Sequence, residues 1–325
     1  MTGMDFKVKK LNLELYKQMY LIRSAESRIC EYYHENEMKT PVHLSIGEEA
    51  ISAGVCTALG PDGQVFGTYR SHGTYLSRTG ETDKFFAELY GKDTGLANGV
   101  GGSMHLSAPE EGFMGTSAIV GSIIPVAVGA AFANKVKGNG KITAVFFGDG
   151  ALDEGVFWES LNAACLMKLP VLFVCEDNGL AVHTSKSLRH GYKSILDITA
   201  QFDCNVIGKD TTDAEMIYKL TRDAIRLIRE SERPCFLYLK YYRYLEHVGT
   251  NEDFGSGYRS KDEFDKWYEV DPVNMQRKKL LRLGFSNEDI REEEMSIDNQ
   301  IDLSIKLAKA APYPDKAELY RELYL

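Results

Sequence analysis

Two oxygen-bearing side chains stand where they could hold a small cation, each shortly after a predicted strand. Asp149 lies within a Gly-Asp-Gly turn that follows the apolar run 142–147, and Asn178 follows a second apolar run, 171–175. Ligands of an open parallel sheet bind outside the carboxyl ends of its strands, so these side chains should meet at one edge. Carboxylate and amide oxygens suit Mg²⁺ or Ca²⁺, and Mg²⁺ completes its octahedron with phosphate oxygens and water. The pattern therefore favours a diphosphate held through a metal ion.

Other interpretations of this pattern differ in how well the sequence supports them. The Gly-Asp-Gly segment can be only a tight turn and Asn178 only a helix cap, and the two positions alone leave that alternative open. A nicotinamide site would use a G-x-G-x-x-G segment that opens a helix, and neither strand is followed by one. No G-x-x-x-x-G-K-[ST] loop is present either, which disfavours an ATPase.

The segment 142–175 predicts the crossover that positions both side chains. Its two apolar runs contain β-branched residues and suit strands that are buried on both faces of a parallel sheet. An apolar stripe between them predicts a helix over 153–167, so strand, helix and strand make one right-handed crossover. The alternation continues with a strand at 204–207, a helix at 214–230 and a strand at 235–240. We therefore expect an α/β fold with a doubly wound, mostly parallel sheet flanked by helices.

The segments before this crossover predict a helical arm and a long loop. Residues 1–40 are expected to form the arm, with a helical apolar rhythm over 11–36, and a second helix is expected over 47–59. Glycine is too dense between residues 91 and 121 for a helix or a strand, which predicts a long, shaped loop there.

The segments after the crossover predict a mobile loop and a helical tail. Residues 246–263 are polar and contain glycine, which favours mobility. Residues 264–325 are charged and helical in pattern, with helices expected over 275–283 and 288–309. We expect the whole chain, 1–325, to form a single domain with this tail.

The composition excludes several classes of protein. The 325 residues are 44% hydrophobic and 26% charged, which is ordinary for a folded domain. Acidic residues outnumber basic ones by 47 to 38 without a Lys/Arg-rich run, so binding to nucleic acid or to an anionic membrane is disfavoured. Six cysteines lie far apart without a CxxC pair, and we see neither a signal-peptide pattern nor an unbroken apolar segment that could span a membrane. We expect free thiols and a cytoplasmic location.

A family resemblance is carried by the segment GDGALDEGVFWESLNAACLMKLPVLFVCEDNGLAVHT. It resembles the thiamine diphosphate motif of the alpha subunits of 2-oxo-acid dehydrogenases of the pyruvate, branched-chain and acetoin types. Six further stretches agree with that family in the same order: HLSIGEEA, FGTYRSHG, ANGVGGSMHL, IVGSIIPVAVGAA, YYRYLEHVG and GYRS. The resemblance covers about residues 15–325.

The resemblance implies a thiamine diphosphate-binding fold with Mg²⁺ as the metal. It makes Asp149, Asn178 and the backbone carbonyl of Leu180 the Mg²⁺ ligands. It also places a set of residues around the cofactor, namely Tyr69, Arg70, His72, Ala118, Val120, Gly148, Gly150 and Ala151. Arg70 suits a diphosphate because the rigid donors of a guanidinium match phosphate oxygens. Ala118 and Val120 would act through backbone groups on the aminopyrimidine ring.

Three histidines match family positions close to the cofactor. His43 and His247 match positions that face the reacting centre, where a group titrating near neutral pH can donate or accept protons. We take these two as the candidate catalytic residues. His72 matches a histidine that borders the diphosphate in pyruvate-type relatives. An isolated histidine is more often a structural hydrogen-bonding residue, and that alternative stays open for each.

The implied activity is that of a dehydrogenase alpha subunit. Such a subunit decarboxylates a 2-oxo acid, or cleaves acetoin, and passes the acyl group to a lipoyl-bearing acyltransferase. In this family the glutamate that activates the cofactor lies on a beta subunit, so an α2β2 heterotetramer is expected. Two alternatives stay open: a carboligase or synthase subunit without a lipoyl acceptor, and a non-catalytic scaffold of the same fold.

The chain departs from the family pattern in the loop after Tyr244. It reads Leu-Glu-His-Val where pyruvate-type subunits have His-Gly-His-Ser. Val248 therefore replaces the regulatory serine of the animal enzymes, and control by phosphorylation at that position is excluded. The pair Leu245-Glu246 matches neither the pyruvate-type nor the branched-chain pattern, which leaves the substrate open.

Small residues recur every four positions in one apolar segment, at Ser117, Gly121, Pro125, Gly129 and Ala133. Where this segment is helical, they would align on one face and permit close approach of another helix. We predict a subunit contact there; a crowded core within the monomer is the alternative.

Overall fold

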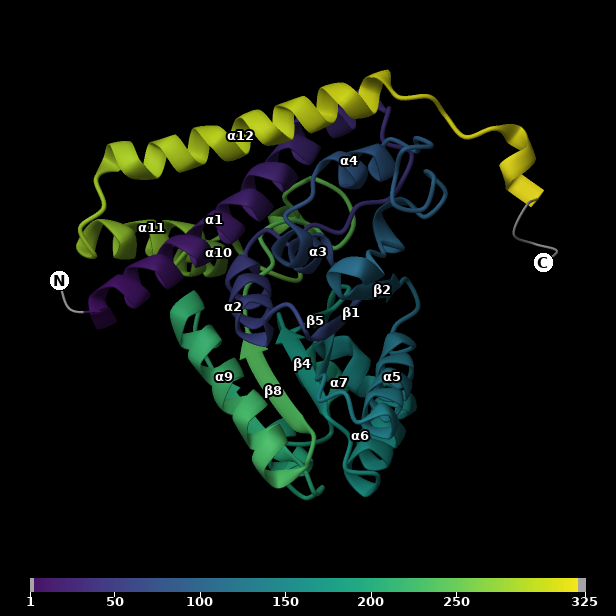
Figure 1. Cartoon of the computed structure of the whole chain (residues 1–325), viewed down its shortest axis with the longest axis vertical. Coiled ribbons are helices and arrows are strands. Elements are labelled where there is room, and N and C mark those ends of the chain that lie inside the picture. The colour runs from purple at the N-terminus through teal and green to yellow at the C-terminus, as the bar shows by residue number, and fades with distance from the viewer. Residues whose placement is uncertain (1–2, 321–325) are drawn as a thin grey trace.

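The computed structural model describes residues 3–320, and a six-stranded sheet runs through its centre (Figure 1). The strands, in the order β2-β1-β3-β4-β8-β7, are all parallel to their neighbours. Their bounds are β1 Gln64–Thr68, β2 Phe113–Ser117, β3 Thr143–Gly148, β4 Val171–Asp177, β7 Asn205–Lys209 and β8 Cys235–Lys240. In the sheet, β2 lies on one side of β1, and β3, β4, β8 and β7 lie on the other. The strand order therefore reverses between β1 and β3. The predicted doubly wound α/β fold is confirmed.

Helices cover both faces of the sheet, which is why its central strands are apolar at nearly every position. In β3, Ala144 and Phe146 pack into the core shared with helices α2 and α9. The alternate residues Val145 and Phe147 pack into the core shared with helices α5 and α6. Side chains of a strand alternate between the two faces of its sheet, so both sets must be apolar. Figure 1 shows α9 on one side of the strands and α5 and α6 on the other.

The helices predicted over 47–59, 214–230, 275–283 and 288–309 fall close to observed ones, whereas the first helix covers 3–32 instead of 11–36, and α3, α4, α5, α7, α8 and α10 were not predicted. The longer ones are α1 Gly3–Tyr32, α2 Glu49–Leu59, α5 Ile123–Lys137, α6 Gly155–Leu166, α9 Ala214–Ser231, α11 Pro272–Arg282 and α12 Asn287–Ala310. The shorter ones are α3 His72–Thr79, α4 Asp83–Leu89, α7 Lys186–Arg189, α8 Ile195–Thr199 and α10 Lys261–Tyr268. A short antiparallel hairpin of β5 Leu180–Ala181 and β6 Thr184–Ser185 follows β4.

The first and last long helices pack against each other across the top of the sheet (Figure 1). Tyr20 and Ser24 of α1 donate hydrogen bonds to Asp298 of α12, at 3.1 and 2.5 Å. Arg28 pairs with Asp302 one turn further on, at 2.7 Å. A capping box at Ser286 and Asp289 fixes the start of α12.

The glycine-rich segment 91–121 was predicted as a loop, and that prediction is wrong at its end. Residues 113–117 form β2, the edge strand that pairs with β1. Glycine weakens a strand, and Gly115 has a φ of 152°. The hydrogen bonds to β1 stabilise this strand although its own sequence does not favour one. The predicted helix over 153–167 also begins two residues late, because residues 149–153 form a 3₁₀ turn.

The small-residue stripe is only partly helical, so the predicted common face is limited to its helical part. Ser117 ends β2, and Gly121 precedes α5 with a φ of 77°. Pro125, Gly129 and Ala133 do lie on α5, and all three are exposed.

Two further predictions concern the thiols and the membrane. All six cysteines are free, and four of them are buried. Within residues 3–320, no helix has the length and apolar character needed to cross a bilayer.

Candidate functional site

A cavity of about 260 Å³ opens at the carboxyl ends of β1, β3 and β4, where the strand order reverses. This is the place where doubly wound sheets bind ligands. Ten of the thirteen predicted site residues line it: Tyr69, Arg70, Val120, Gly148, Asp149, Gly150, Ala151, Asn178, Leu180 and His247. Segments that are distant in the sequence therefore converge as the motifs predicted.

Asp149 and Asn178 present oxygen atoms at this edge. Asp149 is 1% exposed, and its Oδ1 has no hydrogen-bond partner among the described residues. The Nδ2 of Asn178 donates to the Tyr241 hydroxyl at 2.8 Å, while its Oδ1 accepts from the Leu180 amide at 3.0 Å. The Asn178 oxygen is thereby held on the Leu180 side. Burial, reinforced by the nearby Asp177 carboxylate, raises the pKa of Asp149 from its ordinary value of 3.8 to about 6.

Arg189 is the cation that neutralises Asp149 in this structure. Its Nη2 lies 2.5 Å from Oδ2 of Asp149, and its Nη1 pairs with Asp153. Arg189 follows the β5–β6 hairpin in α7, so its contact with Asp149 depends on tertiary folding. The sequence analysis did not identify Arg189. The one feature that could have indicated it is its position within a dozen residues of Asn178.

Gly150 allows the hairpin to approach the Gly-Asp-Gly turn closely. A Cβ at this position would lie 3.1 Å from the Cβ of Ala181, which is tighter than an ordinary contact. A side chain there would push the hairpin away from the cavity that both segments line.

Arg70 reaches across the cavity wall to the loop that carries His247. Its Nη1 donates to the Leu44 carbonyl at 2.7 Å, and its Nη2 donates to the His247 carbonyl at 2.9 Å. The neighbouring Tyr69 ring packs against His43 and His247, with centroid distances of 4.5 and 5.7 Å. Tyr69 and Arg70 follow β1 directly, so the end of that strand positions them.

His43 and His247 form an aromatic cluster with Tyr69, and both are neutral. Their centroids lie 5.3 Å apart in an edge-on arrangement. Burial and the Arg70 cation lower the pKa of His43 and of His247 to about 3. The sequence-based expectation that these groups titrate near neutral pH is therefore wrong for this environment. The Nδ1 atom of His43 is buried without a hydrogen-bond partner among the described residues.

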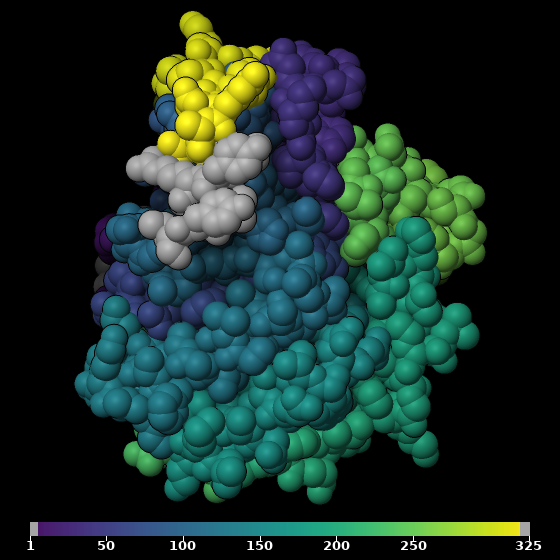
Figure 2. Space-filling model, turned by 90° about the vertical axis from the view of Figure 1, so that its right-hand side faces the viewer, coloured from purple at the N-terminus to yellow at the C-terminus, as the bar shows by residue number. Residues whose placement is uncertain are grey.

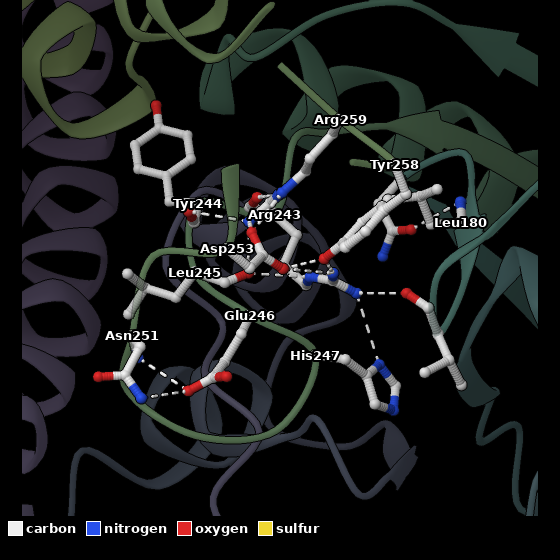
Figure 3. Close-up of polar contacts among 12 residues, drawn as sticks. Leu180, Arg243, Tyr244, Leu245, Glu246, His247, Asn251, Asp253, Tyr258 and Arg259 are labelled. Carbon is white, nitrogen blue, oxygen red and sulfur yellow. Dashed lines mark hydrogen bonds and ion pairs between the residues drawn. The ribbon is translucent and has the colours of Figure 1, made fainter. Parts of the chain in front are cut away.

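A buried ionic network shapes the loop that carries His247 (Figure 3). Arg259 donates to Asp253 and to the carbonyls of Tyr244 and Leu245. Arg243, only 2% exposed, lies 3.6 Å from Asp253 and donates to the Tyr258 hydroxyl at 2.9 Å.

Separate hydrogen bonds hold the tip of this loop. Glu246 accepts hydrogen bonds from the backbone amide and the side chain of Asn251, at 3.0 and 2.9 Å. The Gly249 amide donates to the Val42 carbonyl at 2.8 Å, which ties the loop to the segment that carries His43. The unusual Glu246 therefore closes the turn that follows it.

A family model described as dehydrogenase E1 component matches residues 16–317. The chain belongs to the dehydrogenase E1 component family. It is therefore the alpha component of a thiamine diphosphate-dependent 2-oxo-acid dehydrogenase, as the motifs predicted. This membership makes it an enzyme component rather than a scaffold.

Several curated proteins are similar to this E1 chain over nearly its whole length. A pyruvate dehydrogenase E1 component subunit alpha from Rickettsia felis is 33% identical over 99% of the chain and 100% of its own length. The alpha subunit of acetoin:2,6-dichlorophenolindophenol oxidoreductase from Bacillus subtilis is 32% identical, with 96% and 93% covered. A pyruvate dehydrogenase E1 alpha subunit from Rhizobium meliloti is 33% identical, with 98% and 91% covered.

Three predicted site residues of the E1 chain do not line the cavity. His43 lies behind its wall, in contact with Tyr69, and Ala118 lies between β2 and α5. His72 is fully buried, and its ring nitrogens contact Glu26 and Ser103 at 3.1 and 2.7 Å. Burial lowers the pKa of His72 to about 3 and raises that of Glu26 to about 8, so this pair is a neutral hydrogen bond.

The cavity residues that the sequence analysis did not name as site residues include Glu176 and Tyr241. Glu176 and Tyr241 line the cavity, and burial raises the pKa of each well above its ordinary value. Both sit at the ends of predicted strands, β4 and β8, so position at the sheet edge was the available signal.

Proposed function

We propose that this chain is the alpha subunit of a Mg²⁺-dependent E1 enzyme that decarboxylates a 2-oxo acid and passes the acyl group to a lipoyl-bearing acyltransferase. The convergence of Asp149, Asn178 and Leu180 on one cavity, together with Arg70 and His247, carries the proposal. The named relatives, which are pyruvate and acetoin enzymes, support pyruvate and acetoin as the first substrates to test.

The donor set fits Mg²⁺. It offers one carboxylate with an unpartnered oxygen, one amide oxygen and the Leu180 backbone, all hard oxygen donors. Such a site needs no group of three His, Cys, Asp or Glu side chains, and the described residues contain no group of that kind placed for a metal. The remaining positions of the ion would be filled by diphosphate and water.

Bound thiamine diphosphate supplies the nucleophile for the 2-oxo group and the electron sink for loss of CO₂. The chain's own residues bind and orient the reactants. Tyr69 and Arg70 would hold the diphosphate, and His247 would face the reacting end, with His43 packed behind it against Tyr69. Gly148, Gly150, Ala151 and Val120 line the cavity and would contact the cofactor there, and the Ala118 backbone remains a proposed contact although Ala118 does not line the cavity.

A beta subunit completes the proposed enzyme. In this family it carries the glutamate that activates the cofactor, and we propose an α2β2 heterotetramer. The lipoyl acyltransferase is the proposed acyl acceptor. We also propose a cytoplasmic location, which the six free thiols support.

The experiment for the activity is co-expression with a beta subunit, followed by a screen of pyruvate, branched-chain and longer 2-oxo acids and acetoin. We expect decarboxylation or cleavage with an artificial electron acceptor and acyl transfer to a lipoylated domain. Turnover with the artificial electron acceptor, without acyl transfer to any lipoylated domain and with a new carbon–carbon bond in the product, would favour the carboligase.

The metal assignment has its own test in Asp149→Ala. This change removes the single anionic ligand proposed for the ion, so thiamine diphosphate binding in Mg²⁺ buffer should be abolished in titration calorimetry. Asp197→Ala is the matched control because Asp197 is exposed on α8, away from the cavity wall. Undiminished binding by the Asp149 variant would contradict the assignment.

A further inference from the structure

Two of the six free cysteines form a pair near one edge of the sheet. Cys165 lies in the last turn of α6, and Cys204 lies just before β7, the edge strand. Their thiols are hydrogen-bonded to each other although the residues are distant in sequence. Both side chains belong to the apolar core between the sheet and helices α5 and α6. Tertiary packing therefore brings the two sulfur atoms together.

An aromatic contact holds the same two segments against each other. Trp158 of α6 stacks on Phe202, with ring centroids 6.2 Å apart and 29° between the ring planes. Trp158 and Cys165 are about two helical turns apart, so they lie on the same face of α6. The Cys204 amide donates to the Phe202 carbonyl at 2.7 Å, which fixes the turn that presents Cys204 to this face. The contact between the thiols is therefore part of a packed interface.

The hydrogen bond between the thiols makes them chemically unequal. It lowers the pKa of Cys165, although burial and the Asp203 carboxylate oppose this shift. The same bond raises the pKa of Cys204, which therefore keeps its proton. Burial raises the pKa of each of the other four cysteines, namely Cys30, Cys56, Cys175 and Cys235. Because the thiolate is the nucleophile, Cys165 is the cysteine best placed to react with an oxidant.

Cys235 is a third thiol near the pair, but it is enclosed. It lies on β8 opposite Asn205, the residue after Cys204. Cys235 is 0% exposed, whereas Cys165 is 6% exposed and Cys204 is partly exposed. The Sγ of Cys204 also lies 3.2 Å from the Asn205 carbonyl, which holds it on the edge of the sheet. A small oxidant from solvent therefore has access to the pair and not to Cys235.

We propose that Cys165 and Cys204 form an oxidative modification site, in which hydrogen peroxide converts the two thiols into a reversible disulfide. The Cys165 sulfur attacks one peroxide oxygen, the O–O bond breaks, and the other oxygen leaves as water with the proton that Cys165 released. Cys165 is then a sulfenic acid. The Cys204 sulfur attacks the Cys165 sulfur, the S–O bond breaks, and that oxygen leaves as a second water with the Cys204 proton.

The disulfide would close a loop that carries part of the candidate site. The stretch 166–203 includes β4, Asn178 and α7 with Arg189. A bond at the two ends of this stretch ties the end of α6 to the start of β7 and restricts the motion of the chain there. Disulfides of this kind in a reducing compartment are usually transient and sense oxidants, since a dithiol removes them again.

Peptide mapping of the full chain tests the pairing. The reduced chain is treated with a small excess of hydrogen peroxide, alkylated without a reductant and analysed by mass spectrometry. We expect a linked peptide that joins Cys165 to Cys204 and has lost the two thiol hydrogens, and we expect dithiothreitol to reverse the change. Retention of both free thiols overturns the proposal, and so does a link from Cys204 to Cys235.

Variants separate the roles of the two thiols. Cys204→Ser keeps an O–H donor for Cys165 but cannot form the disulfide, so a sulfenic acid should accumulate on Cys165 and be trapped by dimedone. Cys204→Ala also removes the donor, and trapping should be several-fold slower. Equal trapping in the two variants overturns the role of the hydrogen bond. Cys30→Ala is the matched control, because Cys30 is the other partly exposed cysteine, and it should form the disulfide in normal yield.

Amide hydrogen exchange tests the effect on the fold. We expect exchange over residues 200–207 to be several-fold slower in the oxidised chain than in the reduced chain, and peroxide to cause no slowing in Cys204→Ser. Unchanged exchange in the oxidised chain overturns the proposed restriction. These measurements need neither the cofactor nor a beta subunit, so their outcome is independent of the proposed function.

Discussion

The carboxylate of Asp149, the proposed Mg²⁺ ligand, is buried in a way that lowers the stability of the folded protein. Its one described cationic contact is Arg189, and its second oxygen has no partner among the described residues. Burial raises its pKa to about 6, so ionising it in the folded protein is unfavourable. A cation bound at the unpartnered oxygen would offset this cost.

The first prediction is that Asp149→Asn stabilises the cofactor-free protein above neutral pH. Because the folded pKa, about 6, exceeds the ordinary value of 3.8, the unfolded chain releases its proton first and the folded state loses stability as pH rises between these values. Asparagine avoids this loss. We expect a gain of about 1–3 kcal/mol at pH 7.5 in denaturant unfolding, falling toward zero at about pH 4.

Asp197→Asn is the control for this prediction, since it makes the same change on the surface. A stabilisation by Asp149→Asn that is the same at both pH values would rule out the linkage argument.

At the scale of elements, the loop over residues 246–263 combines exposed polar residues with a buried ionic base. We predict that this loop is mobile without cofactor and becomes ordered with it. Limited proteolysis with and without thiamine diphosphate and Mg²⁺ checks this, and equal resistance in both conditions would contradict it.

A second element-scale prediction concerns the carboxylate at the base of this loop. Asp253→Asn leaves Arg243 and Arg259 buried without the anion that both contact. We expect amide hydrogen exchange across the loop to rise by about 10–100-fold, as for loss of 1–3 kcal/mol of local stability.

Asp262→Asn on the exposed side of α10 is the matched control for this exchange measurement. Exchange that rises equally in the two variants would show that Asp253 has no special role in fastening the loop.

Helix α5 exposes an apolar face that a partner would cover. Val126, Phe132 and Val136 are 55%, 48% and 71% exposed, and the side of the molecule that carries α5 faces the viewer in Figure 2. Gly129 lies on the same helix, and a Cβ added there meets nothing within 4 Å. A larger side chain is therefore tolerated by the isolated chain.

We predict that Gly129→Leu blocks assembly with the beta subunit and leaves the alpha chain folded. Size-exclusion chromatography of the co-expressed pair measures assembly, and circular dichroism of the alpha chain measures its fold. Arg222→Leu adds the same side chain to an exposed position of α9 and is the control. An intact heterotetramer with Gly129→Leu would refute the proposed interface.

The sequence predicts those elements whose local pattern agrees with their final environment. Strands β3, β4 and β8 are continuous apolar runs because both faces of the sheet are covered. The apolar residues of α9 recur with the helical period, so the sequence predicts its two ends to within one residue. Strands β1 and β2 were missed because each has only five residues, contains a glycine (Gly67 and Gly115) and is stabilised by pairing.

The same distinction holds for the site. Asp149 and Asn178 follow predicted strands, so their convergence could be anticipated from topology. Arg189 and Arg243 reach the site only through a hairpin and a folded loop, and no local pattern encodes their contacts. The neutral state of His247 was missed for the same reason, since burial and Arg70 impose it.

At the scale of the whole molecule, the site depends on segments from most of the chain. The cavity collects residues from position 68 to position 247, at the ends of β1, β3 and β4 and just after β8. Parallel strands need crossover connections, so none of this geometry exists in a fragment. A cavity formed in this way is expected to appear only when the entire sheet is complete.

The pairing of α1 with α12 sets the order in which this protein can mature on the ribosome. Tyr16 contacts Glu294 across 278 positions of sequence. Helix α1 emerges well before α12, one of the elements that cover it, so the polar stripe that faces α12 stays exposed until late in synthesis. Nascent chains arrested before residue 287 should therefore hold α1 less firmly than the complete chain does, because the partners of its polar side chains have not yet been made.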